Sequence, residues 1–270
     1  MWDENLEDNA RRNVAWLIGI IAAALIAVGG WYWYASRHRA PAAAPAPPPA
    51  APGTAANGEA QISHPIPGEG PDASALPALN DSDQVARDSL AGVLGKNPVE
   101  QFLVPQSIVR HIVVTVDNLP RNKVAVDLRP VKPTAGQTAV ATQGDITTLS
   151  DANFARYVPL MRVVQEADVK SLAVVYERLY PLFQQSYEDL GYPGKYFNDR
   201  LVEVIDHLLQ APEVKGPVQL VQPKVFYEYA DADLQGRSAG QKLLMRMGPA
   251  NERILKDKLR AFRAEIVKNK

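Results

Sequence analysis

Hydrophobic residues in this chain fall into one long uninterrupted run and several short periodic ones. The run from Val14 to Tyr34 contains no charged residue and ends in Trp31-Tyr32-Trp33-Tyr34. Its length, about 20 residues, suits the hydrocarbon core of a bilayer, and Trp and Tyr favour the headgroup boundary. We therefore expect a transmembrane helix over residues 14–34, which is retained because a secretory signal has a shorter apolar core.

Beyond residue 78 the apolar positions mostly recur every three or four residues. Such spacing favours helices over residues 85–94, 108–118, 154–166, 169–190, 201–209, 239–247 and 254–266. Asp81 and Asp168 are expected to cap the first and the fourth of these helices. Over residues 112–116 the β-branched side chains would suit a strand equally well.

Alternation of apolar and polar residues is confined to short segments. It predicts a strand over residues 124–128, a hairpin that turns at Gln143-Gly144-Asp145, and a second strand pair or an extended arm between Val218 and Tyr229. The expected fold class is therefore mainly α (α+β), a single mostly helical domain with one or two small β-hairpins.

Composition divides the chain into four parts. No Lys or Arg occurs between Ala40 and Arg87, and most of this stretch is rich in Pro and Ala, a mixture that buries little apolar surface and favours extended geometry. We expect a tail at residues 1–13, the membrane helix at 14–34, a disordered Pro/Ala-rich linker at 35–78 and a globular domain at 79–270.

The orientation of the predicted membrane helix follows from the segments that flank it. Arg11 and Arg12 precede the helix and Arg37 and Arg39 follow it, so the positive charges are balanced. A linker without basic residues is easily translocated, and a domain without cysteine tolerates an oxidising compartment. We expect the N-terminus in the cytoplasm of a bacterium, the helix in its inner membrane and the domain in the periplasm.

One group of acidic residues and a histidine is a candidate for chemistry. Helical spacing places four side chains on one side of the predicted helix: Asp199, Glu203, Asp206 and His207. Such a set could bind a metal ion or act as an acid–base pair, but an amphipathic helix presents its solvated face in the same way. His111 and Asp117 could form a titrating pair, although six residues along a helix place them nearly opposite each other. We expect no catalytic residue and no cofactor, and only weak metal candidates in Asp199, Glu203 and His207.

Aromatic and arginine side chains gather at the starts of predicted helices and in loops. This composition is common in grooves that bind peptides or sugars. The candidate binding residues are Arg156, Tyr157, Tyr192, Tyr196, Phe197 and Arg200. Alternatively, these side chains anchor loops at buried helix junctions.

Three further segments have distinctive sequences. They are Arg110-His111-Ile112-Val113-Val114-Thr115-Val116-Asp117-Asn118-Leu119-Pro120-Arg121, Tyr192-Pro193 through Tyr196-Phe197-Asn198-Asp199-Arg200-Leu201, and Gly240-Gln241-Lys242-Leu243-Leu244-Met245-Arg246-Met247-Gly248. Together they resemble the bacterial envelope family known only as domain of unknown function 3014, with its single N-terminal helix and Pro-rich spacer. The resemblance implies an envelope location and assigns no activity or site.

Two hypotheses for function follow. The leading one is a non-enzymatic interaction or scaffold module, anchored in the inner membrane, whose partner is another envelope protein or peptidoglycan. The alternative is a cell-wall-modifying hydrolase that uses Glu203 and His207. Nucleic acid is not an expected partner, because no nucleic-acid-binding motif occurs. Within the membrane helix, Gly19, Ala23 and Ala27 form a small-residue stripe that could pair two copies or simply face lipid.

Overall fold

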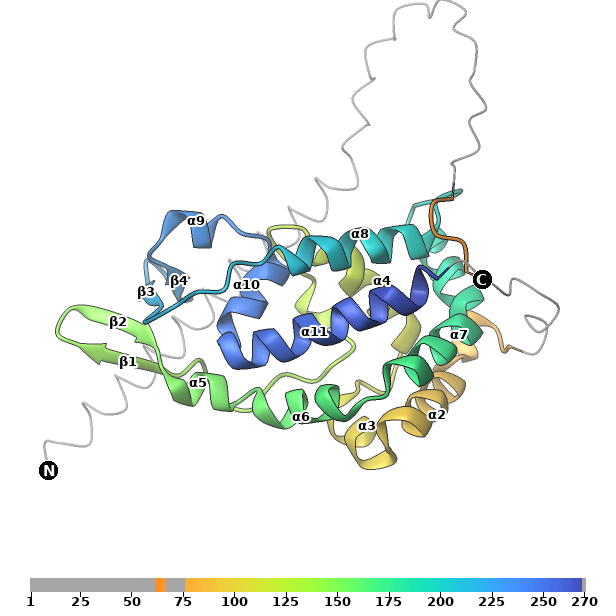
Figure 1. Ribbon diagram of the computed structural model, residues 1–270, viewed down its shortest axis with the longest axis horizontal. Coiled ribbons are helices and arrows are strands. Elements are labelled where there is room, and N and C mark those ends of the chain that lie inside the picture. Colours follow the sequence, from red (N-terminus) through yellow and green to blue (C-terminus); the bar gives the residue numbers. More distant parts are fainter. Residues whose placement is uncertain (1–61, 67–75, 269–270) are drawn as a thin grey trace, which may run out of the picture. The chain divides into compact units, whose positions relative to one another are not determined.

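Helices dominate the structure, a computed structural model that describes residues 62–66 and 76–268 (Figure 1). The helices are α2 (Asp83–Leu94), α3 (Lys96–Phe102), α4 (Ile108–Asn118), α5 (Asp151–Ala155), α6 (Val158–Glu166), α7 (Val169–Asp189), α8 (Phe197–Leu209), α9 (Ala232–Gln235), α10 (Ala239–Arg246) and α11 (Pro249–Ile266). Two 3-10 turns accompany them, η2 (Leu79–Asp81) and η3 (Val126–Leu128). The prediction of a mainly helical domain is confirmed.

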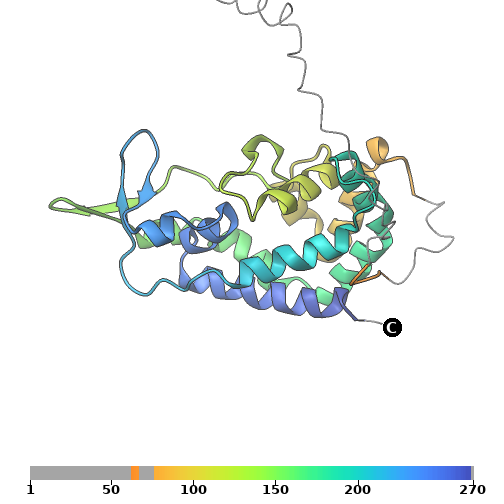
Figure 2. The same ribbon diagram turned by 90° about the horizontal axis from the view of Figure 1, so that it is seen from above.

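In the part of the chain that the structure describes, the strands form one four-stranded antiparallel sheet in the order β1-β2-β3-β4. Its strands are β1 (Val140–Gln143), β2 (Ile146–Leu149), β3 (Gln219–Val221) and β4 (Glu228–Tyr229). Both predicted hairpins are present, and Thr147 pairs with Leu220 to join them. The sheet lies at one end of the helical unit, and the C-terminal end of α11 lies at the other (Figure 2).

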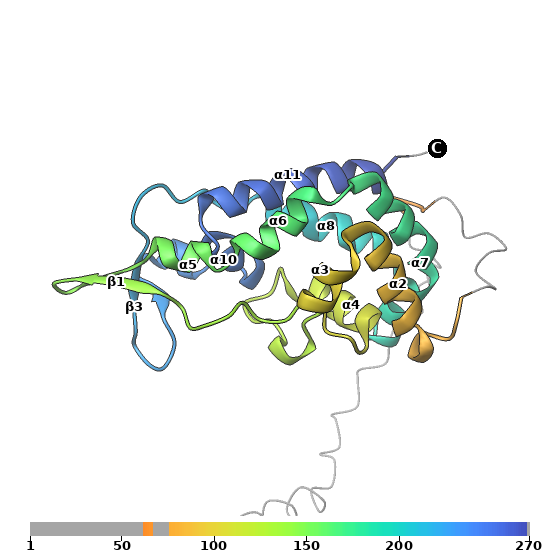
Figure 3. The same ribbon diagram turned by 90° about the horizontal axis from the view of Figure 1, so that it is seen from below.

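Helix α7 is at the centre of the main hydrophobic core. Its predicted apolar stripe is buried at Tyr176, Leu179, Phe183 and Tyr187, and these side chains cluster with residues of α4, α8 and α11. The predicted cap is also confirmed, because the Asp168 carboxylate accepts a hydrogen bond from the Ser171 backbone N–H at 2.8 Å. α6 lies beside α11, while α2 and α4 both pack against α7 and α3 packs against α2 (Figure 3).

Two glycines permit the close contacts of α10. A side chain at Gly240 would meet Leu208 at 2.5 Å and the Leu119 carbonyl oxygen at 3.0 Å. Gly248 has a φ of 85°, and a Cβ there would meet the Phe154 ring at 2.5 Å. These requirements account physically for the glycines at both ends of the segment from Gly240 to Gly248.

Some local predictions were wrong. Residues 124–128 do not form a strand. Residues 126–128 form η3, none of its side chains is buried, and Val126 is 54% exposed, so this segment has no buried apolar face. Asp81 does not cap α2, which begins at Asp83 after Ser82. The helix expected over residues 154–166 is divided into α5 and α6. Pro159 lies in the first turn of α6, a position that favours the start of a new helix. The segment 108–118 is a helix, so the alternative of a strand is excluded.

The boundary between linker and domain also differs from the prediction. Residues 62–66, expected in the disordered linker, lie on the domain, and Ile66 is buried in the main core. The predicted tail, membrane helix, small-residue stripe and most of the linker lie outside the described residues. Within residues 62–66 and 76–268, no helix combines the length with the hydrophobicity that a bilayer crossing requires.

Candidate functional site

The predicted binding residues do not form one groove. Tyr192, Tyr196 and Arg200 line a common polar hollow of about 440 Å³. Phe197 is only 1% exposed and belongs to the main core. The hollow also includes Asp117, which the sequence pattern suggested only as a partner of His111.

Arg156 and Tyr157 lie elsewhere. The Arg156 guanidinium donates hydrogen bonds to the carbonyl oxygens of Ala135 at 2.9 Å and Gly136 at 2.8 Å, and to the Asn153 side chain at 2.8 Å. Tyr157 packs at the edge of a second core cluster. Arg156 therefore holds the loop at residues 134–136, and Tyr157 contributes to apolar packing.

Asp117 is the centre of the polar hollow. Its side chain is 3% exposed and forms ion pairs with Arg121 at 2.5 Å and Arg200 at 3.1 Å. The Tyr192 hydroxyl donates a further hydrogen bond to the carboxylate at 3.2 Å. Because two cations and a hydroxyl surround this buried carboxylate, the cluster ties α4 to the turn before α8 and to α8 itself.

The other polar groups of this region hold the chain's own N-terminal segment. The Asp199 carboxylate accepts hydrogen bonds from the backbone N–H groups of Ser63 at 3.0 Å and His64 at 2.7 Å. The Tyr196 hydroxyl accepts one from the Ile66 N–H at 2.8 Å. The predicted binding residue Tyr196 and the predicted metal candidate Asp199 thus bind a segment of the same chain, here called the docked segment (residues 62–66).

The acidic residues and the histidine of α8 have separate partners. Glu203 pairs with Arg200 at 2.9 Å, and Asp206 accepts two hydrogen bonds from Arg263 at 2.6 and 2.8 Å. His207 Nε2 lies 2.8 Å from the Ser238 hydroxyl, which caps α10. The described residues contain no group of three or more side chains placed to hold a metal ion. Together with Asp199, which binds the docked segment, these side chains therefore have four different sets of partners and do not form one cluster.

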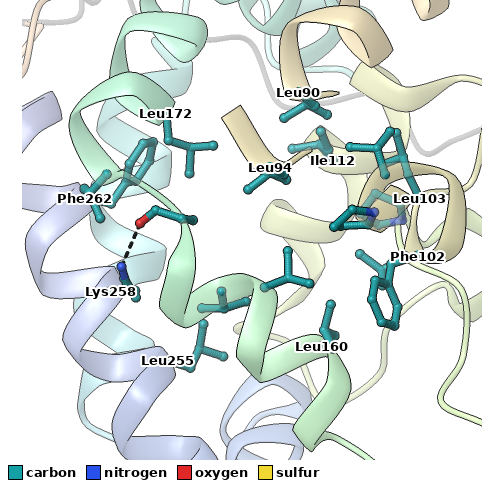
Figure 4. A pocket seen from close by; sticks show the side chains of 18 of the residues that line it. Leu90, Leu94, Phe102, Leu103, Ile112, Leu160, Leu172, Leu255, Lys258 and Phe262 are labelled. Atoms are coloured by element: carbon teal, nitrogen blue, oxygen red, sulfur yellow. Dashed lines mark hydrogen bonds between the residues drawn. The ribbon is translucent and has the colours of Figure 1, made fainter. Parts of the chain in front are cut away.

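The most distinctive surface is an apolar pocket with a volume of about 370 Å³ (Figure 4). Helices α2, α3, α4, α6, α7 and α11 and the loop at residues 130–131 form its wall. The lining residues are Leu90, Leu94, Pro98, Val99, Phe102, Leu103, Ile112, Pro130, Val131, Leu160, Val163, Val164, Ala167, Val169, Leu172, Leu255, Lys258, Leu259 and Phe262. We call this the open apolar pocket, because every lining residue except Val99 is only half-buried.

A smaller apolar hollow of about 200 Å³ lies next to the open apolar pocket. The two spaces share Leu90, Ile112, Leu172 and Phe262 in their walls. Among the described lining residues of both spaces, only Lys258 carries a charge. The Lys258 ammonium donates a hydrogen bond to the Ala167 carbonyl oxygen at 2.7 Å, where α6 gives way to α7 (Figure 4).

A glycine turn and two backbone hydrogen bonds fix the position of α3 in the wall of the pocket. Gly95, with a φ of 87°, separates α2 from α3. Backbone hydrogen bonds from Val104 N–H to Pro130 and from Lys132 N–H to Phe102, both 2.8 Å, fix the end of α3 to the loop. Sequence reasoning missed the pocket because its lining comes from separate segments, each of which only shows an ordinary apolar stripe.

Comparison with known proteins gives a family and no activity. Residues 108–263 match the model of the family described as protein of unknown function (DUF3014), so the chain belongs to this family. The matched range includes the walls contributed by α4, α6, α7 and α11, whereas α2 and α3 precede it. No curated protein and no solved structure shows a significant match. The family resemblance of the sequence is thus confirmed.

Proposed function

We propose that this protein is a non-catalytic binding module of the bacterial cell envelope, anchored in the inner membrane by residues 14–34, with its helical domain in the periplasm. The open apolar pocket is the single observation that carries the binding role. Pockets of about 300–1,000 Å³ with mostly apolar walls are typical of sites for small ligands or inserted side chains.

The cost of leaving the pocket open supports a role in binding. Apolar surface that is not buried forgoes about 25 cal/mol per Å² of stabilisation. The wall concentrates Leu, Val and Phe side chains around one hollow instead of scattering them over the surface. Such a gathering of apolar side chains around one hollow is typical of sites that a ligand fills.

The polar side chains favour binding over catalysis. An acid–base mechanism needs a nucleophile, base or acid that can reach a substrate. Glu203 pairs with Arg200, and His207 pairs with the cap of α10, so the residues of the hydrolase hypothesis already have structural partners. The wall of the open apolar pocket provides no carboxylate, imidazole or hydroxyl among its described residues.

The sequence supports the proposed anchor, and the docked segment limits the length of the spacer that follows it. The uncharged run from Val14 to Tyr34 has the length of a bilayer-spanning helix. Since Ser63 and His64 are bonded to Asp199, the spacer between the proposed anchor and the domain ends before residue 63 and not at residue 78. In polyproline geometry, at about 3 Å per residue, such a spacer would reach on the order of 80 Å from the bilayer.

Two experiments test the proposal. Protease treatment of intact spheroplasts should digest the domain, and alkaline carbonate should leave the chain in the membrane fraction. Protection of the domain or release of the chain would contradict the anchored location.

Complementation of a deletion strain tests the binding role. Leu172→Trp fills the pocket and should abolish complementation, whereas Val174→Trp, on the same helix but 63% exposed, should complement fully. The double variant Glu203→Ala, His207→Ala should also complement. Failure of that double variant, at normal protein levels, would favour the hydrolase.

A further inference from the structure

We propose that the ligand of the open apolar pocket is a free fatty acid, a single alkyl chain whose carboxylate lies against Lys258. This inference rests on the proposed binding function and specifies its ligand. The polarity of the wall, the size of the space and the position of Lys258 point to this ligand.

The polarity of the wall selects an alkyl chain over a peptide or a sugar. Peptide groups and hydroxyls transferred into an apolar site without hydrogen-bond partners lose about 1–3 kcal/mol each. Among the described lining residues, Lys258 alone carries a polar side chain, and α-helical hydrogen bonds occupy most of the backbone groups around it. An alkyl chain has no polar group to satisfy, so it enters this space without that penalty.

The size of the space favours one chain. The open apolar pocket, at about 370 Å³, lies near the lower end of the range for small-ligand sites. A second hollow of about 200 Å³ lies next to it, shares Leu90, Ile112, Leu172 and Phe262 with its wall, and is also lined by Tyr176 and Phe183. A space of this volume suits one narrow chain, whereas a bulky ring system or two parallel chains would need more room.

The charge of Lys258 sets the polarity of the ligand's end. An ammonium group has three donors, and one of them is directed at the Ala167 carbonyl oxygen. The nearby Asp168 has a lowered pKa, chiefly because of hydrogen bonds from Ser171 and in smaller part because of Lys170 and Lys258. Lys258 thus projects positive charge at the α6–α7 junction, where a carboxylate could replace water beside it.

Photolabelling of the full chain in nanodiscs tests the ligand directly. The probe is palmitic acid with a diazirine near the end of its chain, and crosslinked peptides are identified by mass spectrometry. We expect labelling on α7 and α11 next to Leu172 and Phe262 in the wild type. Leu172→Trp on α7 and Leu255→Trp on α11 should each reduce it at least about tenfold, because a filled site excludes the chain.

Matched controls keep this test interpretable. Val174→Trp should label like the wild type, and circular dichroism should show that all the variants are folded. Labelling spread over the surface, or unchanged in both filled variants, would overturn the proposal. Pocket labelling by a diacyl phospholipid probe but not by palmitic acid would overturn the assignment of a single free chain.

The head group is tested with paired probes. Lys258→Met keeps the aliphatic stem and removes the charge, so it should weaken competition by palmitic acid about tenfold and leave competition by hexadecanol unchanged. Lys170→Met, an exposed lysine on α7, is the control and should change neither. Equal loss for the acid and the alcohol would show that Lys258 only packs.

Chain length gives a readout that nonspecific partitioning does not. Each added methylene should tighten binding about fourfold until the pocket is full, after which the affinity should stop rising. A rise without a plateau would indicate partition into lipid and contradict the proposal. If palmitic acid fails while Leu172→Trp still abolishes complementation, the ligand class is wrong and the proposed function stands. If both fail, neither stands.

Discussion

The polar hollow around Asp117 and the open apolar pocket are similar in size but opposite in the state of their side chains. In the polar hollow, Asp117, Tyr192 and Arg200 bind one another, and Asp199 and Tyr196 bind the docked segment. In the open apolar pocket, half-buried Leu, Val and Phe side chains face space. The sequence predicts Tyr192, Tyr196 and Arg200 as binding residues, but their polar groups bind other parts of the same fold.

This difference separates structural sites from binding sites. A buried carboxylate is tolerated only with partners, so a cluster of charges is often a structural connection. Large apolar side chains that converge without covering one another have no such structural explanation. The comparison therefore predicts that changes in the polar hollow affect stability and changes in the pocket affect binding.

The largest effect is expected from Asp117. Asp117→Asn removes the charge that two arginines share and should lower the free energy of unfolding by about 3 kcal/mol, at the low end for a broken buried pair because Arg121 is half exposed. Thermal unfolding of the full chain in mild detergent measures it. Glu203→Gln is the control: it faces the same Arg200 but is 68% exposed, so its cost should stay below about 0.5 kcal/mol. Equal effects would remove the structural role of Asp117.

Truncation of apolar side chains should distinguish the pocket wall from the sealed core. Leu244→Ala, in the second core cluster, leaves a closed cavity and should cost about 3 kcal/mol. Leu255→Ala, in the half-open wall, should cost only about 1 kcal/mol, because part of its surface already faces space. Urea unfolding in the same detergent measures both variants. Similar losses would mean that the wall is packed as a core.

Removing the Asp199 carboxylate should release the docked segment. Asp199→Ala deletes the acceptor of two backbone N–H groups and should cost about 1–2 kcal/mol. Hydrogen exchange should accelerate at Ser63 and His64 and remain unchanged in the pocket wall. Asp257→Ala, which removes an exposed ion pair on α11, is the control and should leave the exchange of both residues unaltered.

Alkaline titration should give the smallest effect and should act on the polar hollow. Burial raises the pKa of Tyr187 to about 12, and the negative charge of Asp117 also raises this pKa, while the positive charge of Arg200 opposes the shift. The folded state then holds the proton more tightly than the unfolded state, so this stability is complete below pH 10 and is lost as the pH rises toward 12. Tyr187→Phe should flatten the fall in melting temperature over this interval. An unchanged slope would contradict the assigned pKa.

Local periodicity predicted much of the fold. The apolar stripes of α4, α7, α8, α10 and α11 are long enough that packing agrees with pattern. Residues 124–128 failed because a short alternation says nothing about whether a partner strand is available. The predicted cap at Asp81 was wrong because α2 begins two residues later, at Asp83. The Asp83 carboxylate accepts hydrogen bonds from the Ser107 and Ile108 N–H groups at the start of α4.

The sites were less predictable than the fold. The sequence shows that Tyr192, Tyr196 and Arg200 are close along the chain, but not that Asp117, from another helix, completes their bonding. Ile66 is a single apolar residue in a Pro/Gly-rich stretch, so its burial has no periodic signal. An apolar pocket forms where helices leave a space that their side chains do not fill. This depends on how the helices pack in three dimensions and not on the pattern of any one segment.

Native mass spectrometry of the full chain, extracted from its own membranes, tests the central claim most directly. The claim is that the open apolar pocket is a ligand site. We predict one bound molecule per chain with the mass of a single fatty acid in the wild type and in Val174→Trp, and its loss in Leu172→Trp. A wild-type chain without any bound mass, or an equal adduct in Leu172→Trp, would contradict the account.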